Sequence, residues 1–301
     1  MNKNKNSSLF QWGKAFLYTF LFLFIISISI LAYMVNLSYD LPTLDELKNF
    51  NPEQISKVIS ADGQVLHKLQ AVKKREVVKI GEIPQELIDA LIVMEDKEFY
   101  NHSGFSVRST LRAVLINILM MEYKQGASTL TQQLARSMYE KISWKDRSIV
   151  RKIKELITAF NIEQTYTKSE ILELYLNSVF LGHGRYGVQS AAQLYFKKNV
   201  SELNFDECAM LVGMLPAPNL YSPFRNLNLA NKRKYLVLDV MKQNELIDLY
   251  DYTFYYDKKL EIASRSTEKF SGIAPYFNEH VRKELETVSY THLTLPTSDL
   301  V

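Results

Sequence analysis

Residues 84–104 read PQELIDALIVMEDKEFYNHSG, and the apolar residues of this segment recur with the period of an α-helix. Its opening proline suits the first position of a helix. The residues that then follow at four-residue steps are Leu87, Leu91, Glu95 and Phe99. This spacing places their side chains on one helical face, the face expected to meet an apolar core. We therefore predict a helix from this proline that carries one carboxylate, Glu95, on its apolar side.

Glu95 is the first candidate for chemistry. A carboxylate among apolar side chains is poorly solvated, which makes it a better proton acceptor and suits a general base. The alternative is a surface carboxylate near a turn, since Asp96 follows directly. His102 closes the segment, and a turn or capping role is its simplest interpretation.

Helical periodicity continues downstream, whereas the segment upstream has strand character. We expect further helices at Val107–Tyr123, from Ser128 or Thr129, at Arg147–Gln164, from a capping box at Thr167–Glu170 through Leu176, and at 204–215 and 229–244. Residues 57–69, KVISADGQVLHKL, place two β-branched runs around an Asp-Gly pair, which is typical of a hairpin. REVVKI at 75–80 favours a third short strand. The sequence thus predicts a mainly α domain with a small β element.

The N-terminal segment predicts a membrane anchor. Residues 15–35, AFLYTFLFLFIISISILAYMV, are almost wholly apolar, and about 20 helical residues span a hydrocarbon core. Lysines precede this run and acidic residues follow it, which predicts a cytoplasmic N-terminus at 1–14 and an external remainder. We expect a transmembrane helix at 15–37 and a linker at 38–54. A cleavable signal peptide is the alternative, but the run is longer than usual for one.

Composition and charge narrow the classes of protein to which this chain could belong. The net charge of +3 over 301 residues does not indicate a nucleic-acid partner. The chain has one cysteine, Cys208, so no intrachain disulfide can form. Because Cys208 lies in an apolar stretch, we interpret it as a core residue rather than a reactive thiol.

The second candidate segment is GASTLTQQLAR at residues 126–136. It is a transition from loop to helix, where backbone N–H groups and the hydroxyls of Ser128 and Thr129 suit an anionic oxygen. Gln132, Gln133 and Arg136 share a face with Thr129. A simple solvated face is an equally good interpretation of this polar stripe.

The third candidate is a charged cluster made of Arg147, Arg151, Lys152, Lys154 and Glu155. The apolar stripe of this helix, which includes Ile149 and Phe160, lies on the other side and is expected to face the core. The cluster is either a solvated face or a diphosphate site, in which several cations balance the charge of a leaving group. Two glutamates on different helices with a basic strip fit chemistry at a sugar diphosphate.

These segments, in this order, resemble glycosyltransferase family 51, the peptidoglycan glycosyltransferase domain of monofunctional transglycosylases and class A penicillin-binding proteins. The resemblance rests on EDKEFYNHSG at 95–104, GASTLTQQ at 126–133, RKIKE at 151–155, ILELYLN at 171–177, and LPAP at 215–218 with Tyr221-Ser-Pro. It covers about residues 10–245. Two departures from the family pattern are small: Ala127 replaces a usual glycine, and Arg136 stands where lysine is common.

The resemblance implies a lysozyme-like helical domain at 55–250 that polymerises lipid II into β-1,4 glycan strands with inversion. Glu95 matches the base that deprotonates the acceptor 4-hydroxyl, and Glu155 matches the residue that assists departure of undecaprenyl diphosphate. The positions that match substrate contacts are Asp96, Phe99, His102, Arg112, Ser128, Thr129, Gln132, Gln133, Arg136, Arg151 and Lys154. The resemblance leaves open a divalent metal, Mg²⁺ or Mn²⁺, near Glu155 and implies no organic cofactor. Its implied partners are lipid II, the growing glycan, the bacterial cytoplasmic membrane and other cell-wall synthesis proteins.

The C-terminal residues set a limit on the expected activity. APYF at 274–277 resembles the segment that leads into a transpeptidase domain, so we assign 251–287 to a linker toward such a domain. Ser266 and Lys269 have the spacing of a transpeptidase nucleophile motif but lack its partners. The run VSYTHLTLPT at 288–297 resembles a sequencing adapter, and an ordinary disordered terminus is the alternative. We expect no transpeptidase activity from these residues.

Two other functions fit part of the pattern. A lysozyme-like hydrolase would use two carboxylates to cleave glycan, but it would need neither the basic strip nor the hydroxyl-rich helix start. A membrane-anchored scaffold without catalysis would not need Glu95.

Overall fold

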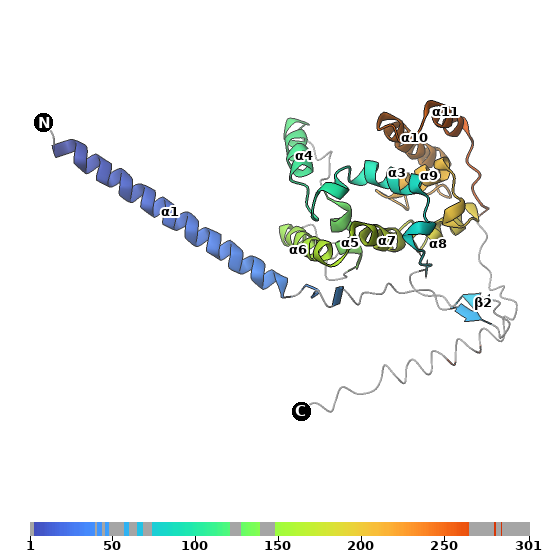
Figure 1. Ribbon diagram of the computed structural model, residues 1–301, viewed down its shortest axis with the longest axis horizontal. Helices are drawn as coiled ribbons and strands as arrows, with labels where there is room; N and C mark the ends of the chain where they lie inside the picture. Colours follow the sequence, from blue (N-terminus) through green and yellow to red (C-terminus); the bar gives the residue numbers. More distant parts are fainter. Residues whose placement is uncertain are drawn as a thin grey trace.

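The computed structural model describes residues 3–39, 41–43, 46–47, 57–59, 65–68, 74–120, 128–138, 148–264, 280 and 284, and helices dominate them (Figure 1). The α-helices are α1 (Lys3–Ser38), α3 (Gln85–Glu95), α4 (Val107–Met120), α5 (Leu130–Met138), α6 (Ile149–Thr165), α7 (Lys168–Ser178), α8 (Val188–Phe196), α9 (Phe205–Met214), α10 (Leu227–Gln243) and α11 (Leu249–Asp257). The short elements are 3-10 helices at Ile80–Glu82, Phe99–Asn101 and Val200–Glu202 and strands β1 (Lys57–Ile59), β2 (Val65–Lys68), β3 (Lys74–Arg75) and β4 (Arg185–Tyr186). The predicted mainly α architecture is confirmed.

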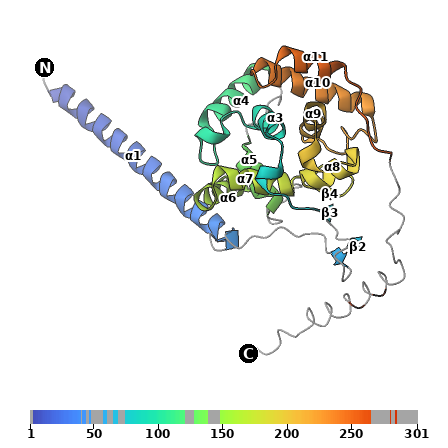
Figure 2. The same cartoon turned by 45° about the vertical axis from the view of Figure 1, so that its right-hand side comes forward.

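Helix α9 forms the centre of the core. All of its residues from Asp206 to Met214 are buried, and it packs against α3 and α10 (Figure 2). At Gly213 a Cβ atom would lie 3.1 Å from the backbone of Arg233, so the glycine lets α9 and α10 approach closely. Cys208 is buried in this helix, as predicted, and burial raises the pKa of its thiol well above the usual range. A buried, protonated thiol is a packing residue.

The four-residue row of the opening segment is largely confirmed. Leu87, Leu91 and Phe99 are buried in the core, whereas Glu95 at the end of α3 is half-buried. The helix begins one residue later than predicted, because the proline serves as its N-cap.

Helix α6 has the opposite orientation to the one predicted. Ile149 and Phe160 of its apolar stripe are 80% and 54% exposed, whereas Glu155 and Thr158 on the polar face are fully buried. Both the expected core-facing stripe and the alternative of a solvated charged face are therefore wrong. A buried carboxylate needs compensating partners, and Glu155 lies beside Arg136, Arg151 and Lys152.

The β element is split in two. Strands β1 and β2 form the predicted antiparallel hairpin, with a register shift between Val58 and Ile59. The strand expected at 75–80 is wrong in extent: the strand itself covers Lys74–Arg75, and it pairs in parallel with β4, more than a hundred residues later. This pairing depends on a contact distant in sequence, which local patterns do not encode.

The N-terminal helix extends away from the helical body in both views (Figures 1 and 2). The predicted anchor at 15–37 falls within α1. Across the part of the chain that the structure describes, no helix is both long and apolar enough to cross a membrane. Part of the predicted linker belongs to the helical domain, because Leu47 is fully buried and its carbonyl accepts a hydrogen bond from Tyr166.

The helical domain continues past the predicted boundary at residue 250. Helix α11 packs against α10, Leu260 is buried, and the amide of Ala263 donates to the carbonyl of Tyr195 at 2.8 Å. The first part of the expected 251–287 linker is therefore part of the domain. Helices α8 and α11 were not predicted.

The other predicted helices are confirmed with shifts of one to three residues at their ends. Helix α7 begins with the predicted capping box: the Thr167 hydroxyl accepts from the Glu170 amide while the Glu170 carboxylate accepts from the Thr167 amide. The predicted extension of α4 to Tyr123, the residue Arg147, the APYF segment at 274–277 and the run at 288–297 lie outside the described residues.

Candidate active site

Glu95 lies at the C-terminal end of α3 and receives one neutral hydrogen bond. The side-chain amide of Gln133, from α5, donates to Glu95 Oε2 at 2.8 Å. Gln133 is held in turn by Tyr175 of α7, whose hydroxyl donates to the Gln133 amide oxygen at 3.0 Å. Since Glu95 is half-buried, its carboxylate is both oriented by the protein and open to a substrate.

Glu155 occupies a different environment, because it is fully buried among cations. Lys152 Nζ lies 3.1 Å from Glu155 Oε2, and the guanidinium groups of Arg151 and Arg136 lie 3.5 and 3.9 Å from Oε1. Burial lowers the pKa of Lys152, and the Glu155 carboxylate opposes this effect. Three cations around one carboxylate leave a local excess of positive charge, which suits a polyanionic ligand.

Lys152 connects the two predicted clusters. Its ammonium also donates to Gln132 Oε1 at 2.7 Å and to Ser128 Oγ at 2.9 Å, so α6 is tied to the start of α5. The sequence assigned Lys152 to the basic cluster but proposed Lys154 as the contact residue. The signal for Lys152 was its three-residue spacing from Glu155, which places the two on one helical face. Lys154 is half-buried on α6.

Helix α5 brings the two carboxylates into one site. Gln132 contacts Lys152 on the Glu155 side, and the next residue, Gln133, contacts Glu95. Arg136, one turn further, interacts electrostatically with both Glu155 and Glu95. The solvated alternative for the polar stripe of α5 is therefore wrong.

The loop after Glu95 is locked to α5. Asp96 accepts from the backbone amide of Leu130 at 3.0 Å and lies 3.0 Å from His102 Nε2. The carbonyl of Gly104 accepts from Thr129 Oγ1 at 2.8 Å and from Gln132 Nε2 at 2.9 Å. Donors that the sequence offered to an anionic oxygen, namely the Leu130 amide and the Thr129 hydroxyl, are thus engaged within the protein.

The buried members of this loop have a structural environment. The Asp96 and His102 side chains are 3% and 6% exposed, and Phe99 is fully buried under the Lys168 ammonium, 4.5 Å from the ring centroid. Gly104 has φ +82°, and a Cβ there would lie 3.0 Å from the backbone of Ala159 in α6. These residues hold the Glu95 and Glu155 segments together.

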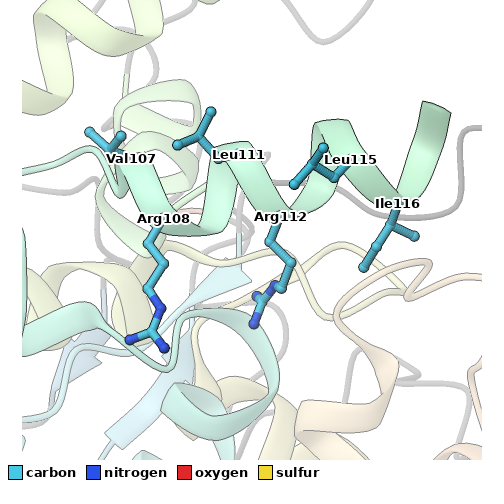
Figure 3. A pocket seen from close by; sticks show the side chains of 6 residues that line it. All are labelled: Val107, Arg108, Leu111, Arg112, Leu115 and Ile116. Atoms are coloured by element: carbon cyan, nitrogen blue, oxygen red, sulfur yellow. The ribbon is translucent and has the colours of Figure 1, made fainter. Parts of the chain in front are cut away.

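Arg112 lies apart from this cluster, on α4. With Arg108, Val107, Leu111, Leu115 and Ile116 it lines an open groove of about 640 Å³. Figure 3 shows Arg108 and Arg112 pointing in the same direction, while Val107 and Leu111 project from the other side of the helix. The groove thus combines two cations with an apolar surface.

The residues beside Glu155 do not fit a divalent metal. Its carboxylate is surrounded by Arg136, Arg151 and Lys152, and the positive charges of these side chains would repel a metal cation. Among the described residues, no group of three or more His, Cys, Asp or Glu side chains is positioned to hold one.

Comparisons with a family model and with individual proteins agree with one another. The family model described as "Transglycosylase" matches residues 62–242. "Penicillin-binding protein 1A" of Neisseria lactamica is 38% identical over 262 residues, which are 87% of this chain and 32% of that protein. "Penicillin-binding protein 1A" of Aquifex aeolicus is 36% identical over 255 residues, which are 85% of this chain and 34% of that protein.

A solved structure is also similar to this chain. The crystal structure of penicillin-binding protein 1A from Haemophilus influenzae aligns with a TM-score of 0.41 and 23% identity, covering 77% of this chain and 24% of the other. The chain thus spans about a third or less of the length of the relatives it matches.

Proposed function

The chain belongs to the transglycosylase family, glycosyltransferase family 51, and from this premise we propose that it polymerises lipid II into β-1,4 peptidoglycan strands and releases undecaprenyl diphosphate. The observation that carries the proposal is the pairing, across α5, of the oriented Glu95 carboxylate with a cluster of partly exposed cations around the buried Glu155. A glycosyl transfer from a diphosphate needs a base for the acceptor and positive charge for the leaving group. Glu95 supplies the first and the cations around Glu155 supply the second.

The reaction follows from these roles. Glu95 takes the proton of the acceptor sugar 4-hydroxyl, and the oxygen attacks the anomeric carbon of the donor. The bond from that carbon to the diphosphate oxygen breaks, and Arg136, Arg151 and Lys152 balance the charge that builds on the departing diphosphate. Attack opposite the leaving group inverts the anomeric centre.

The remaining predicted contact residues have two roles in this proposal. Ser128, Thr129, Gln132 and Gln133 shape the start of α5 between the two charge centres, and Lys154 adds to the basic face of α6. Asp96, Phe99 and His102 support the loop that follows Glu95, which their burial favours over direct contact. Arg112 with Arg108 on α4 would meet the diphosphate or the lipid portion of a lipid-linked substrate.

We further propose that residues 15–37 anchor the protein in the bacterial cytoplasmic membrane, with residues 1–14 in the cytoplasm and the helical domain outside. A lipid-linked substrate requires the site to operate at a membrane surface. Other cell-wall synthesis proteins are the expected partners there.

Incubation of the purified chain with lipid II in detergent tests the activity. We expect glycan polymer and undecaprenyl diphosphate, measured by gel separation of labelled product. Cleavage of finished glycan without polymer formation would instead support a hydrolase, and neither reaction would support a scaffold.

A further inference from the structure

A hydrogen-bond relay connects the core of the domain to the carboxylate of Glu95. Tyr175 of α7 donates to the amide oxygen of Gln133 at 3.0 Å, and the amide nitrogen of Gln133 donates to Glu95 at 2.8 Å. Tyr175 is 2% exposed and belongs to the segment ILELYLN, to which the proposed reaction assigns no role. The relay therefore connects the buried hydroxyl of Tyr175 to the half-buried carboxylate of Glu95.

The chemistry of the relay gives each member a fixed direction. An ionised carboxylate only accepts hydrogen bonds, so Gln133 must turn its NH₂ group toward Glu95 and its oxygen toward Tyr175. Tyr175 then acts as the donor. Burial raises the pKa of Tyr175 well above its usual range, with a further contribution from Glu95, so the hydroxyl keeps its proton at neutral pH.

Removing the Tyr175 hydroxyl would affect the Glu95 carboxylate indirectly, through Gln133. The amide oxygen of Gln133 would lose its donor, and successive hydrogen bonds strengthen one another, so donation to Glu95 would weaken as well. The amide could also rotate away, because Gln133 is only partly buried. A base must be held close to its productive geometry for proton transfer.

We propose that Tyr175 is a positioning residue that orients the Glu95 carboxylate through the side-chain amide of Gln133. This inference rests on the proposed function. It predicts an effect on the rate of the chemical step and little effect on substrate binding.

The test is a kinetic comparison of Tyr175→Phe with the unaltered full chain on lipid II. We expect kcat to fall roughly 10-fold, because the hydrogen bond from Gln133 to Glu95 is weakened and its geometry loosened, with KM changed about twofold or less. The pH dependence of kcat is recorded alongside, because a purely structural loss would lower kcat by the same factor at every pH.

Tyr195→Phe is the matched control. Tyr195 is also fully buried, and its hydroxyl donates to a backbone carbonyl, that of Leu181, at 2.8 Å. Its removal costs a comparable buried hydrogen bond outside the relay. We expect kcat and the pH profile of this variant to stay near those of the unaltered chain.

A double-mutant cycle with Gln133→Met separates the relay from general destabilisation. Methionine keeps the length of glutamine but neither donates to Glu95 nor accepts well from Tyr175, so this variant alone should lose kcat even if Tyr175→Phe does not fold. In the Gln133→Met background, adding Tyr175→Phe should lower kcat less than twofold, because the hydroxyl no longer has a route to Glu95.

Three results would overturn the inference: an unchanged kcat in folded Tyr175→Phe, an equal loss in Tyr195→Phe, or full additivity with Gln133→Met. If Tyr175→Phe does not fold, an unchanged kcat in Gln133→Met would overturn it. An unaltered chain that forms no polymer contradicts the proposed function instead, so the two failures are distinguishable.

Discussion

The two ends of the site differ in what surrounds their carboxylates. Glu95 is half-buried and accepts one hydrogen bond from a neutral amide. Glu155 is fully buried and lies within 3.9 Å of three cationic side chains. The first environment leaves a carboxylate available for a proton, whereas the second commits it to neutralising positive charge. The proposed reaction assigns the two residues different roles accordingly, Glu95 as base and Glu155 as the organiser of an anion site.

The largest expected effect on stability is at the Glu155 end. Glu155→Gln removes a buried carboxylate that lies within 3.9 Å of three cations, and breaking a buried ion pair from one side costs about 3–5 kcal/mol. We expect the free energy of unfolding, measured by urea denaturation, to fall by that amount. Glu95→Gln should change it by about 1 kcal/mol or less, because a glutamine still accepts from Gln133. Equal losses in the two variants would erase the proposed difference between the ends.

A smaller effect is expected at Lys152, which joins the Glu155 end to α5. Lys152→Met should reduce kcat on lipid II about 30-fold, because it removes about 2 kcal/mol of charge stabilisation from the leaving group. Lys154→Met, on the same helix, tests the competing assignment from the sequence. If Lys154→Met lowers kcat more than Lys152→Met does, the assignment of Lys152 as a cation that stabilises the leaving group is incorrect.

The elements of the domain were largely predictable because apolar spacing reports helical period. The row of Leu87 and Leu91, the capping box of α7 and the hairpin were recognised from local signals alone. Spacing does not say which face of a helix is inside, however. In α6 the regular apolar stripe is exposed at Ile149, and the charged face that holds Glu155 is inside.

The elements that were missed depend on tertiary contacts. Helix α11 is rich in tyrosine, a weak helix former, and its end is held from α10, where Lys234 donates to the carbonyls of Tyr255 and Lys258 at 3.2 Å each. For the site, residue types and order indicated both carboxylates, but the contacts of Lys152 with Ser128 and Gln132 and of Tyr175 with Gln133 depend on distances between helices. No sequence spacing reports those distances.

The measurement that tests the central claim most directly is the polymerisation rate of Glu95→Gln on lipid II, with its unfolding free energy measured in parallel. A general base contributes about 10²–10⁴-fold. We predict a loss of kcat within that range in a protein that is as stable as the unaltered chain to about 1 kcal/mol. A folded Glu95→Gln protein that keeps more than a tenth of the activity would contradict the assignment of Glu95 as the base.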